Sequence, residues 1–198
     1  MLAGLVALML DPALAGPLLR YLGELVVWNK AYNLTSVREP AEMVTRHLLD
    51  SLAVLPYVSG RVLDVGTGAG LPGIPLALAN PGLHLGLLDS NGKKTRFLRH
   101  AARTLSLDNV EVIEARAEKH VATQPYDCIV SRAYASTADF LKTTDALAAP
   151  DGRWIAMKGK LDRKELAEIP AAYVLEETVR LQVPGLAEDR HLLLIRRA

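Results

Sequence analysis

A turn with three alternating glycines is the part of the sequence that most clearly predicts chemistry. Gly66, Gly68 and Gly70 follow a short apolar run, and a helical stretch begins soon after them. Glycine permits positive φ and lets a ligand approach the backbone closely. Dinucleotide enzymes bind a pyrophosphate at such a turn, and methyltransferases bind the methionine part of S-adenosylmethionine there. An ordinary tight turn without a ligand is the third interpretation.

The residues around this turn favour S-adenosylmethionine. Asp64 comes two residues before the first glycine, and a carboxylate there suits a cationic amino acid group better than a pyrophosphate. Pro72 lies inside Gly68-x-Gly70-x-x-Gly73, the pattern of a dinucleotide site, and lacks the backbone donor that a phosphate would use. The turn therefore predicts a methyltransferase more strongly than a dinucleotide enzyme.

An acid at the end of the next apolar run strengthens the prediction of a nucleoside site. Asp89 follows the glycine turn by about twenty residues, where a carboxylate can hold ribose hydroxyls. Both cofactor classes use such an acid, so it does not choose between them. A cap for the helix that starts near Asn91 is the alternative role, and the two roles are compatible.

The residues of other methyltransferase chemistries are absent. Cytosine-C5 enzymes need a thiolate nucleophile, but Cys128 lies in an apolar run and is expected to pack as a small hydrophobe. Enzymes that modify the adenine amine commonly have an Asn/Asp-Pro-Pro-aromatic loop, whereas the corresponding loop is Ser131-Arg132-Ala133-Tyr134. The sequence thus fits an acceptor that needs no activation, such as a ring nitrogen, with catalysis by positioning alone.

A basic stretch after Asp89 could bind RNA phosphates through its charge. On a helix, Arg96, Arg99 and Arg103 would share one face with His100. A solvated helix face is the alternative interpretation. The basic residues of the stretch are Lys93, Lys94, Arg96, Arg99 and Arg103.

Short apolar runs that alternate with helical stretches must position these residues. After Gly60 this alternation predicts a mostly parallel sheet with βαβ crossovers, and together with the glycine turn it indicates an α/β, Rossmann-like class I methyltransferase fold with seven strands. The last two runs, joined by Pro184-Gly185 and a polar loop, predict an antiparallel C-terminal hairpin at one sheet edge. The predicted strands are Val62–Val65, Leu83–Leu88, Val110–Ile113, Cys128–Val130, Trp154–Met157, Tyr173–Val183 and His191–Arg196.

The residues before the first strand predict an N-terminal helical cap. Apolar residues recur at three- and four-residue steps from Leu14 to Trp28, and again from Val44 to Leu55 after Pro40. No linker separates this cap from the rest. We therefore expect one methyltransferase domain over residues 1–198, with the cap at 1–59 and the Rossmann-like core at 60–198.

Composition and charge exclude several classes of protein. The formal net charge of +1 gives no global basic field, so nucleic-acid binding must rest on local charge. A single cysteine excludes intrachain disulfides and multi-cysteine zinc sites, and suits a reducing cytoplasm. The apolar residues 1–10 are too few to span a bilayer and lack the positive residues of a signal peptide. We expect a cytoplasmic monomer without a membrane or metal partner.

Seven short motifs between about residues 28 and 160 match one known family. They are Trp28-Asn29-Lys30-x-x-Asn33-Leu34-Thr35, Arg46-His47-Leu48-Leu49-Asp50-Ser51, Asp64-Val65-Gly66-Thr67-Gly68-Ala69-Gly70-Leu71-Pro72-Gly73-Ile74-Pro75, Asp89-Ser90-x-x-Lys93-Lys94, Arg116-Ala117-Glu118, Ser131-Arg132-Ala133 and Met157-Lys158-Gly159. Through them the chain resembles the RsmG family, also called glucose-inhibited division protein B, of small-subunit ribosomal RNA guanine-N7 methyltransferases. The extended glycine motif is far more specific than the bare glycine pattern.

The resemblance implies methylation of guanine N7 at position 527 of 16S ribosomal RNA, an atom whose free lone pair needs no general base. The substrate would be this RNA or a small ribosomal subunit particle, and the cofactor S-adenosyl-L-methionine. The resemblance places cofactor contacts on Gly66, Leu71, Ala117, Glu118 and Arg132. The arguments from the turn and from the ribose acid add Gly68 and Asp89.

Several basic and polar residues are candidate RNA contacts. His47 is expected to pack or to touch RNA rather than act as a base, because N7 needs none, and no catalytic side chain is predicted. A non-catalytic ribosome- or RNA-binding protein with a nucleoside pocket and a dinucleotide-dependent oxidoreductase stay open as alternatives. The candidate RNA contacts are Lys30, Asn33, Arg46, His47, Lys93, Lys94, Arg96 and Lys158.

Overall fold

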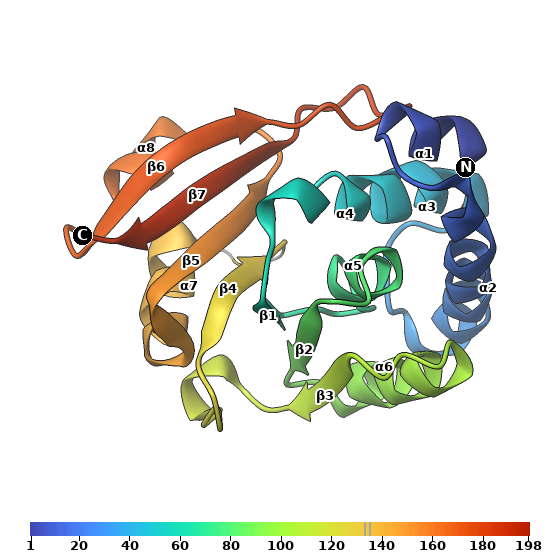
Figure 1. Ribbon diagram of the computed structural model, residues 1–198, viewed down its shortest axis with the longest axis horizontal. Helices are drawn as coiled ribbons and strands as arrows, with labels where there is room; N and C mark the ends of the chain where they lie inside the picture. The colour runs from blue at the N-terminus through green and yellow to red at the C-terminus, as the bar shows by residue number, and fades with distance from the viewer. Residues whose placement is uncertain (133, 135) are drawn as a thin grey trace.

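A central β-sheet organises the chain (Figure 1). The computed structural model describes residues 1–132, 134 and 136–198, and within them seven strands form one sheet in the order β3-β2-β1-β4-β5-β7-β6. The strands are β1 (Arg61–Val65), β2 (His84–Asp89), β3 (Val110–Glu114), β4 (Tyr126–Ser131), β5 (Ala148–Lys158), β6 (Tyr173–Arg180) and β7 (His191–Arg197).

The pairing of the strands confirms the predicted mostly parallel sheet with an antiparallel C-terminal hairpin. Strands β1 to β5 pair with one another in parallel, and β7 is antiparallel to both β5 and β6. The chain runs outward from β1 to β3 and then returns to place β4 on the other side of β1. Ligands of open α/β sheets bind at the carboxyl ends of the strands beside such a switch point.

Most predicted strand boundaries differ from the observed ones by one or two residues, and the start of β5 and the end of β6 differ by more. β5 begins at Ala148 rather than at the predicted Trp154. Pro150 and its polar neighbours are typical of a turn, but a register shift in the pairing with β4 accommodates them within the strand. β6 ends at Arg180 rather than Val183, and β2 begins one residue late, at His84.

Helices cover both faces of the sheet (Figure 1). The N-terminal helices with α5 and α6 pack on one face, and α7 and α8 lie on the other. The helical segments are α1 (Leu2–Ala7), η1 (Pro12–Leu14), α2 (Ala15–Tyr32), α3 (Pro40–Met43), η2 (Val44–Leu49), α4 (Asp50–Leu52), η3 (Leu55–Tyr57), α5 (Gly73–Ala79), α6 (Gly92–Thr104), η4 (Ala117–Lys119), α7 (Thr137–Thr144), η5 (Asp145–Leu147) and α8 (Arg163–Ala167).

The second predicted helix contains a π-helical turn. Between α3 and α4, η2 has π rather than α geometry, and the residues from His47 to Asp50 are all buried. An α-helical period would turn part of such a run toward solvent. His47 and Asp50 are both buried where this π turn meets α4, and such turns occur frequently at functional sites.

Helix α2 is tied to the glycine turn. The buried hydroxyl of Tyr21 donates to the carbonyl of Ala69 at 2.6 Å. Near the end of the same helix, the buried amide of Asn29 accepts from Thr35 N at 2.9 Å and donates to Val37 O at 3.4 Å. Asn29 thus shapes the loop between α2 and α3.

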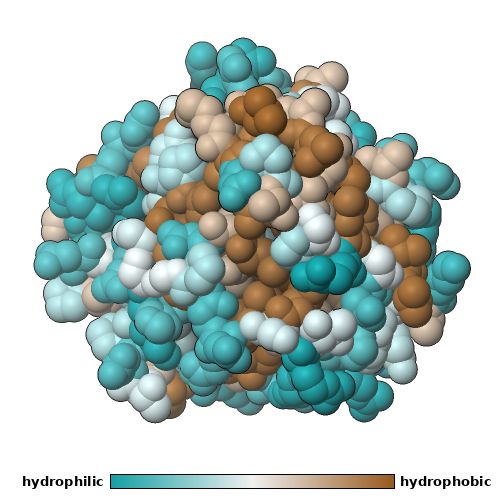
Figure 2. Space-filling model, turned by 45° about the vertical axis from the view of Figure 1, so that its right-hand side comes forward, coloured by the Kyte–Doolittle hydropathy of each residue, from teal (hydrophilic) through white to brown (hydrophobic). Residues whose placement is uncertain are grey.

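The N-terminal helices also expose apolar side chains. Leu5 of α1 is buried in the core, as expected of a helix that packs on it, but other apolar residues of these helices face outward. Figure 2, which brings this side of the molecule forward, shows apolar side chains gathered among polar ones. The exposed apolar residues of this region are Leu2, Val6, Met9, Leu19 and Val27.

Candidate active site

The glycine turn between β1 and α5 has a backbone that favours glycine. The angle φ is +68° at Gly66, +61° at Gly68 and +89° at Gly70, which is the left-handed region. At Gly70 a Cβ would also lie 2.5 Å from Cδ1 of Ile74, so packing requires glycine there as well. The amide of Gly66 donates to Leu88 O at 2.8 Å and ties the turn to the end of β2.

The carboxylate of Asp64 supports the turn from inside. Its Oδ2 accepts hydrogen bonds from the Thr67 hydroxyl at 2.6 Å and from the Gly73 amide at 2.8 Å. Burial raises the pKa of Asp64 to about 6, although these two hydrogen bonds act against the rise. Oδ1 is buried with no hydrogen-bond partner among the described residues. Asp64 therefore holds the turn in shape, a role that the sequence analysis did not assign.

The carboxylate of Asp89 joins the glycine turn to the start of α6. Oδ2 accepts from the Gly68 amide at 3.0 Å and lies 3.4 Å from the ammonium of Lys94, and Oδ1 accepts from the Asn91 amide at 2.9 Å. The N-cap of α6 is Asn91, whose side chain accepts from Lys93 N. The alternative that Asp89 itself caps the helix is thus wrong.

A cavity of about 400 Å³, here called the β1–β3 cavity, opens at the carboxyl ends of β1, β2 and β3. Tyr134 and Asp139 are part of its wall, and the sequence analysis missed both as site residues. The aromatic residue in the loop after the fourth strand was a visible signal, whereas Asp139 joins the cavity only through the fold. The predicted cofactor residues that line the cavity are Gly66, Asp89, Ala117 and Glu118.

The other three predicted cofactor residues do not line this cavity. Gly68 faces Asp89 through its amide. Leu71 is buried in the core that helices α2, α5 and α6 form on the sheet. Arg132 points into a neighbouring cavity, so the structure brings together only part of the predicted set.

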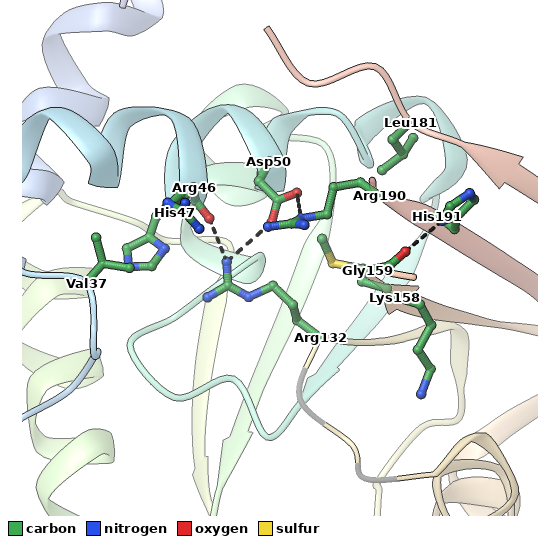
Figure 3. Close-up of a pocket in the computed structure, with 11 residues that line it drawn as sticks. Val37, Arg46, His47, Asp50, Arg132, Lys158, Gly159, Leu181, Arg190 and His191 are labelled. Carbon is green, nitrogen blue, oxygen red and sulfur yellow. Dashed lines mark hydrogen bonds and ion pairs between the residues drawn. The ribbon is translucent and has the colours of Figure 1, made fainter. Parts of the chain in front are cut away.

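The neighbouring cavity, here called the β4–β5 cavity, has a volume of about 340 Å³ (Figure 3). Arg132 lines it, while Tyr134 lines the first cavity. Ala133 of the same motif lies outside the described residues. The residues that line the β4–β5 cavity are Val37, Arg46, His47, Asp50, Arg132, Met157, Lys158, Gly159, Leu181, Arg190 and His191.

A buried carboxylate lies between two guanidinium groups in this cavity (Figure 3). Asp50 Oδ1 is 3.2 Å from Arg190 Nε, and Oδ2 is 3.6 Å from Arg132 Nη1, which also donates to Arg46 O at 3.2 Å. Burial raises the pKa of Asp50, and the two guanidinium groups act against the rise. The sequence analysis quoted Asp50 within a motif but gave it no role.

The ring of His47 is uncharged at neutral pH. Burial, together with the nearby charge of Arg132, lowers its pKa to about 4. Its Nε2 lies 2.8 Å from the Thr35 hydroxyl, while Nδ1 is buried with no hydrogen-bond partner among the described residues. This geometry fits a packing or RNA-contact role better than a role as a cation.

The two candidate RNA cations of this cavity are already paired. Arg46 contacts Glu188 and, at 3.6 Å, Glu42. Lys158 Nζ lies 2.5 Å from Glu165 Oε1. A phosphate would have to compete with these carboxylates for the two cations.

The basic face of α6 lies where the sequence predicted it. Arg96, Arg99, Arg103 and His100 line one shallow hollow of about 330 Å³ together with Trp28. Arg99 pairs with Glu114 at 3.2 Å and His100 with Glu24 at 2.7 Å. Arg96 and Arg103 are exposed, and the described residues give them no ion pair.

The remaining RNA candidates differ in their surroundings. Lys30 and Lys93 are exposed, and Lys94 is drawn toward Asp89. Asn33 ends α2 in the left-handed conformation, with φ +51°, and accepts from Arg38 Nη2 at 2.8 Å, so it has a structural role in the turn.

Other chemistries find no support in the part of the chain that the structure describes. Burial raises the pKa of the Cys128 thiol to about 12, which suits a packing residue and not a nucleophile. The described residues contain no group of three acidic, histidine or cysteine side chains that could hold a metal. None of the helices formed by them is long and apolar enough to cross a bilayer.

Solved structures share this arrangement. N-methyltransferase NodS from Bradyrhizobium japonicum superposes with a TM-score of 0.56 at 16% identity, over 77% of this chain and 94% of that one. Coclaurine N-methyltransferase bound to N-methylheliamine and SAH gives 0.57 at 15%, over 74% of this chain and 52% of that one. The sheet order and the glycine turn thus define a class I methyltransferase. The chain belongs to the rRNA small subunit methyltransferase G (GidB) family, whose sequence model matches residues 16–193.

A close relative supports the same family. Ribosomal RNA small subunit methyltransferase G of Xanthomonas axonopodis pv. citri is 52% identical over 195 residues, which cover 98% of this chain and 92% of that protein. The chain is accordingly an S-adenosylmethionine-dependent methyltransferase of small-subunit ribosomal RNA. The resemblance found in the sequence is confirmed, and the dinucleotide interpretation of the glycine turn is left without support.

Proposed function

We propose that the protein transfers a methyl group to N7 of a guanine in 16S ribosomal RNA, at the position that the family resemblance implies. The observation that carries this proposal is that Arg132 lines the β4–β5 cavity while Tyr134 lines the β1–β3 cavity. A cofactor in the β1–β3 cavity would thus lie beside Tyr134, and a base in the β4–β5 cavity would lie beside Arg132.

The β1–β3 cavity fits a nucleoside cofactor. A Cβ at Gly66 would have no neighbour within 4 Å, so the backbone there faces open space that a ligand can fill. Asp89 would hold the ribose, and Ala117 with Glu118 would border the adenine. Gly68 supports these contacts by positioning Asp89. We also propose the cofactor contacts of Leu71 and Arg132 that the resemblance implies.

The protein would act mainly by positioning. S-adenosylmethionine supplies an electrophilic methyl group, and transfer forms a bond from N7 to the methyl carbon while the carbon–sulfur bond breaks. N7 loses no proton in this step, so no side chain has to act as a base. The chain would hold the two reactants in line and keep water away.

We propose that the RNA crosses the basic face of α6 and the rim of the β4–β5 cavity. Lys93 and Arg96 would contact phosphates directly, and Lys94 would do so beside Asp89. Lys30, Asn33, Arg46, His47 and Lys158 remain proposed contacts, with Arg46 and Lys158 exchanging their carboxylate partners for phosphate.

We further propose that cap and core form one domain, which acts as a cytoplasmic monomer. The hydrogen bond from Tyr21 to Ala69 and a core shared by α2, α5 and α6 support the single domain. A ribosomal RNA substrate and a lone buried cysteine support the cytoplasm.

Tritiated-methyl transfer tests the proposal. Ribosomal RNA and small-subunit particles from cells that lack the modification would be incubated with the protein and labelled cofactor, and the labelled base mapped. We expect label at N7 of one guanine. Cofactor binding without transfer to any RNA would leave only a binding function, and label on another base would contradict the proposed acceptor.

A further inference from the structure

The β4–β5 cavity presents a hydrogen-bond donor and an acceptor side by side. The guanidinium of Arg132 and the carboxylate of Asp50 both line it, with Nη1 3.6 Å from Oδ2. Figure 3 shows the two groups pointing toward each other from the end of β4 and from the cap. Such a pair matches a ligand edge that has an acceptor next to a donor.

Asp50 retains hydrogen-bonding capacity in this position. A carboxylate offers about four lone-pair sites, and its contacts in the structure are to Arg190 and Arg132. The side chain is only 3% exposed, so what it accepts must enter the cavity. The guanidinium of Arg132 likewise has more N–H donors than its contacts to Asp50 and to Arg46 O use.

The Watson–Crick edge of guanine complements this pair. It presents the O6 acceptor, then the N1–H donor and the N2 amine, whereas adenine presents a donor at N6 and an acceptor at N1. Enzymes that modify an extruded base commonly read this edge. N7 lies next to O6 on the adjacent Hoogsteen edge and takes no part in the hydrogen bonds of the Watson–Crick edge.

We infer, on the basis of the proposed function, that Asp50 selects guanine by accepting N1–H and the N2 amine while Arg132 donates to O6. Adenine also carries a free N7 lone pair, so the reactivity of the acceptor atom does not distinguish the two bases. With adenine, the carboxylate would face the N1 lone pair and the guanidinium would face the N6 amine. Both contacts would be repulsive, so Asp50 is a specificity-determining residue.

The wild-type enzyme gives the first test, which needs no folded variant. Small-subunit RNA would be prepared with guanosine or with inosine, which lacks the N2 amine, at the methylated position. Loss of one good base contact corresponds to roughly 5- to 150-fold, and we expect kcat/KM for inosine to fall by that factor. Equal rates on the two RNAs would overturn the inference, whereas no N7 transfer to guanosine would instead overturn the proposed function.

Asp50→Asn gives the second test, with Glu188→Gln as the matched control. Glu188 pairs with Arg46 but does not line the cavity, so its amide variant also removes one carboxylate beside a cavity arginine. We expect Asp50→Asn to bring the guanosine-to-inosine ratio close to one and Glu188→Gln to keep the wild-type ratio. If Asp50→Asn lowered both rates equally, with the ratio preserved, Asp50 would only hold the arginines in place and the inference would be wrong.

Discussion

Removal of the Tyr21 hydroxyl tests whether helix α2 holds the glycine turn in shape. The hydroxyl donates to Ala69 O at 2.6 Å, and the Tyr21 side chain is fully buried. Burial raises the pKa of Tyr21 well above its usual range, so the hydroxyl keeps its proton at any working pH. Phenylalanine fills the same space without this donor.

The expected loss follows from one buried hydrogen bond. In Tyr21→Phe the Ala69 carbonyl is left without its partner, which costs about 1–3 kcal/mol. For a chain of this size each kcal/mol lowers Tm by about 2–4 °C, so we expect a fall of about 2–12 °C. Because the carbonyl lies in the turn proposed to hold S-adenosylmethionine, we also expect up to about a tenfold rise in the cofactor Kd, equal to 1.4 kcal/mol.

Thermal unfolding and calorimetry with S-adenosylmethionine measure the two effects. Tyr32→Phe is the matched control, because Tyr32 lies in the same helix and the described residues give its hydroxyl no hydrogen bond. The control should change stability by less than about 0.5 kcal/mol. If Tyr21→Phe matched the control in both Tm and Kd, the hydrogen bond would not support the turn.

Three further changes probe the cofactor site, the RNA face and the buried acid. Asp89→Ala should weaken S-adenosylmethionine binding by about 1–3 kcal/mol in calorimetry; an unchanged affinity would mean that Asp89 only joins the glycine turn to the start of α6. Replacing Arg96 and Arg103 by Gln should flatten the salt dependence of RNA binding by about 0.7–0.9 in log–log slope per lost phosphate contact, and an unaltered slope would mean a merely solvated face. Because burial raises the pKa of Asp64 from 3.8 to about 6, the folded state binds this proton more tightly than the unfolded state. Stability should therefore fall by about 3 kcal/mol between pH 4 and 6; denaturant unfolding of Asp64→Asn should lack this fall, and an unchanged pH profile would contradict the assignment.

Local patterns were sufficient to predict the sheet and the glycine turn. The strands are short apolar runs bounded by turn residues. The turn is indicated by glycines with an acid two residues upstream, a pattern that does not depend on residues far away in the sequence. Asp89 was predictable because a parallel sheet places the ends of β1 and β2 at one edge.

The rest of the site depends on contacts between distant residues. Asp50 pairs with Arg190, 140 residues away, and follows a π turn that no 3.6-residue period reveals. The early start of β5 was hidden because Pro150 normally signals a turn. The family resemblance assigned Arg132 to the cofactor site, but the sequence could not predict that its side chain lines the β4–β5 cavity rather than the β1–β3 cavity.

Because β7, the last strand of the chain, pairs with β5, the β4–β5 cavity takes residues from near the end of the sequence. Translation must therefore reach β7 before this cavity can be complete. The β1–β3 cavity is lined by residues up to Asp139, whereas the β4–β5 cavity needs Arg190 and His191. At about 5–20 residues per second, roughly 3–10 s of synthesis separate these positions. Translation that stops in this interval yields a chain that has every lining residue of the first cavity but lacks Arg190 and His191 of the second.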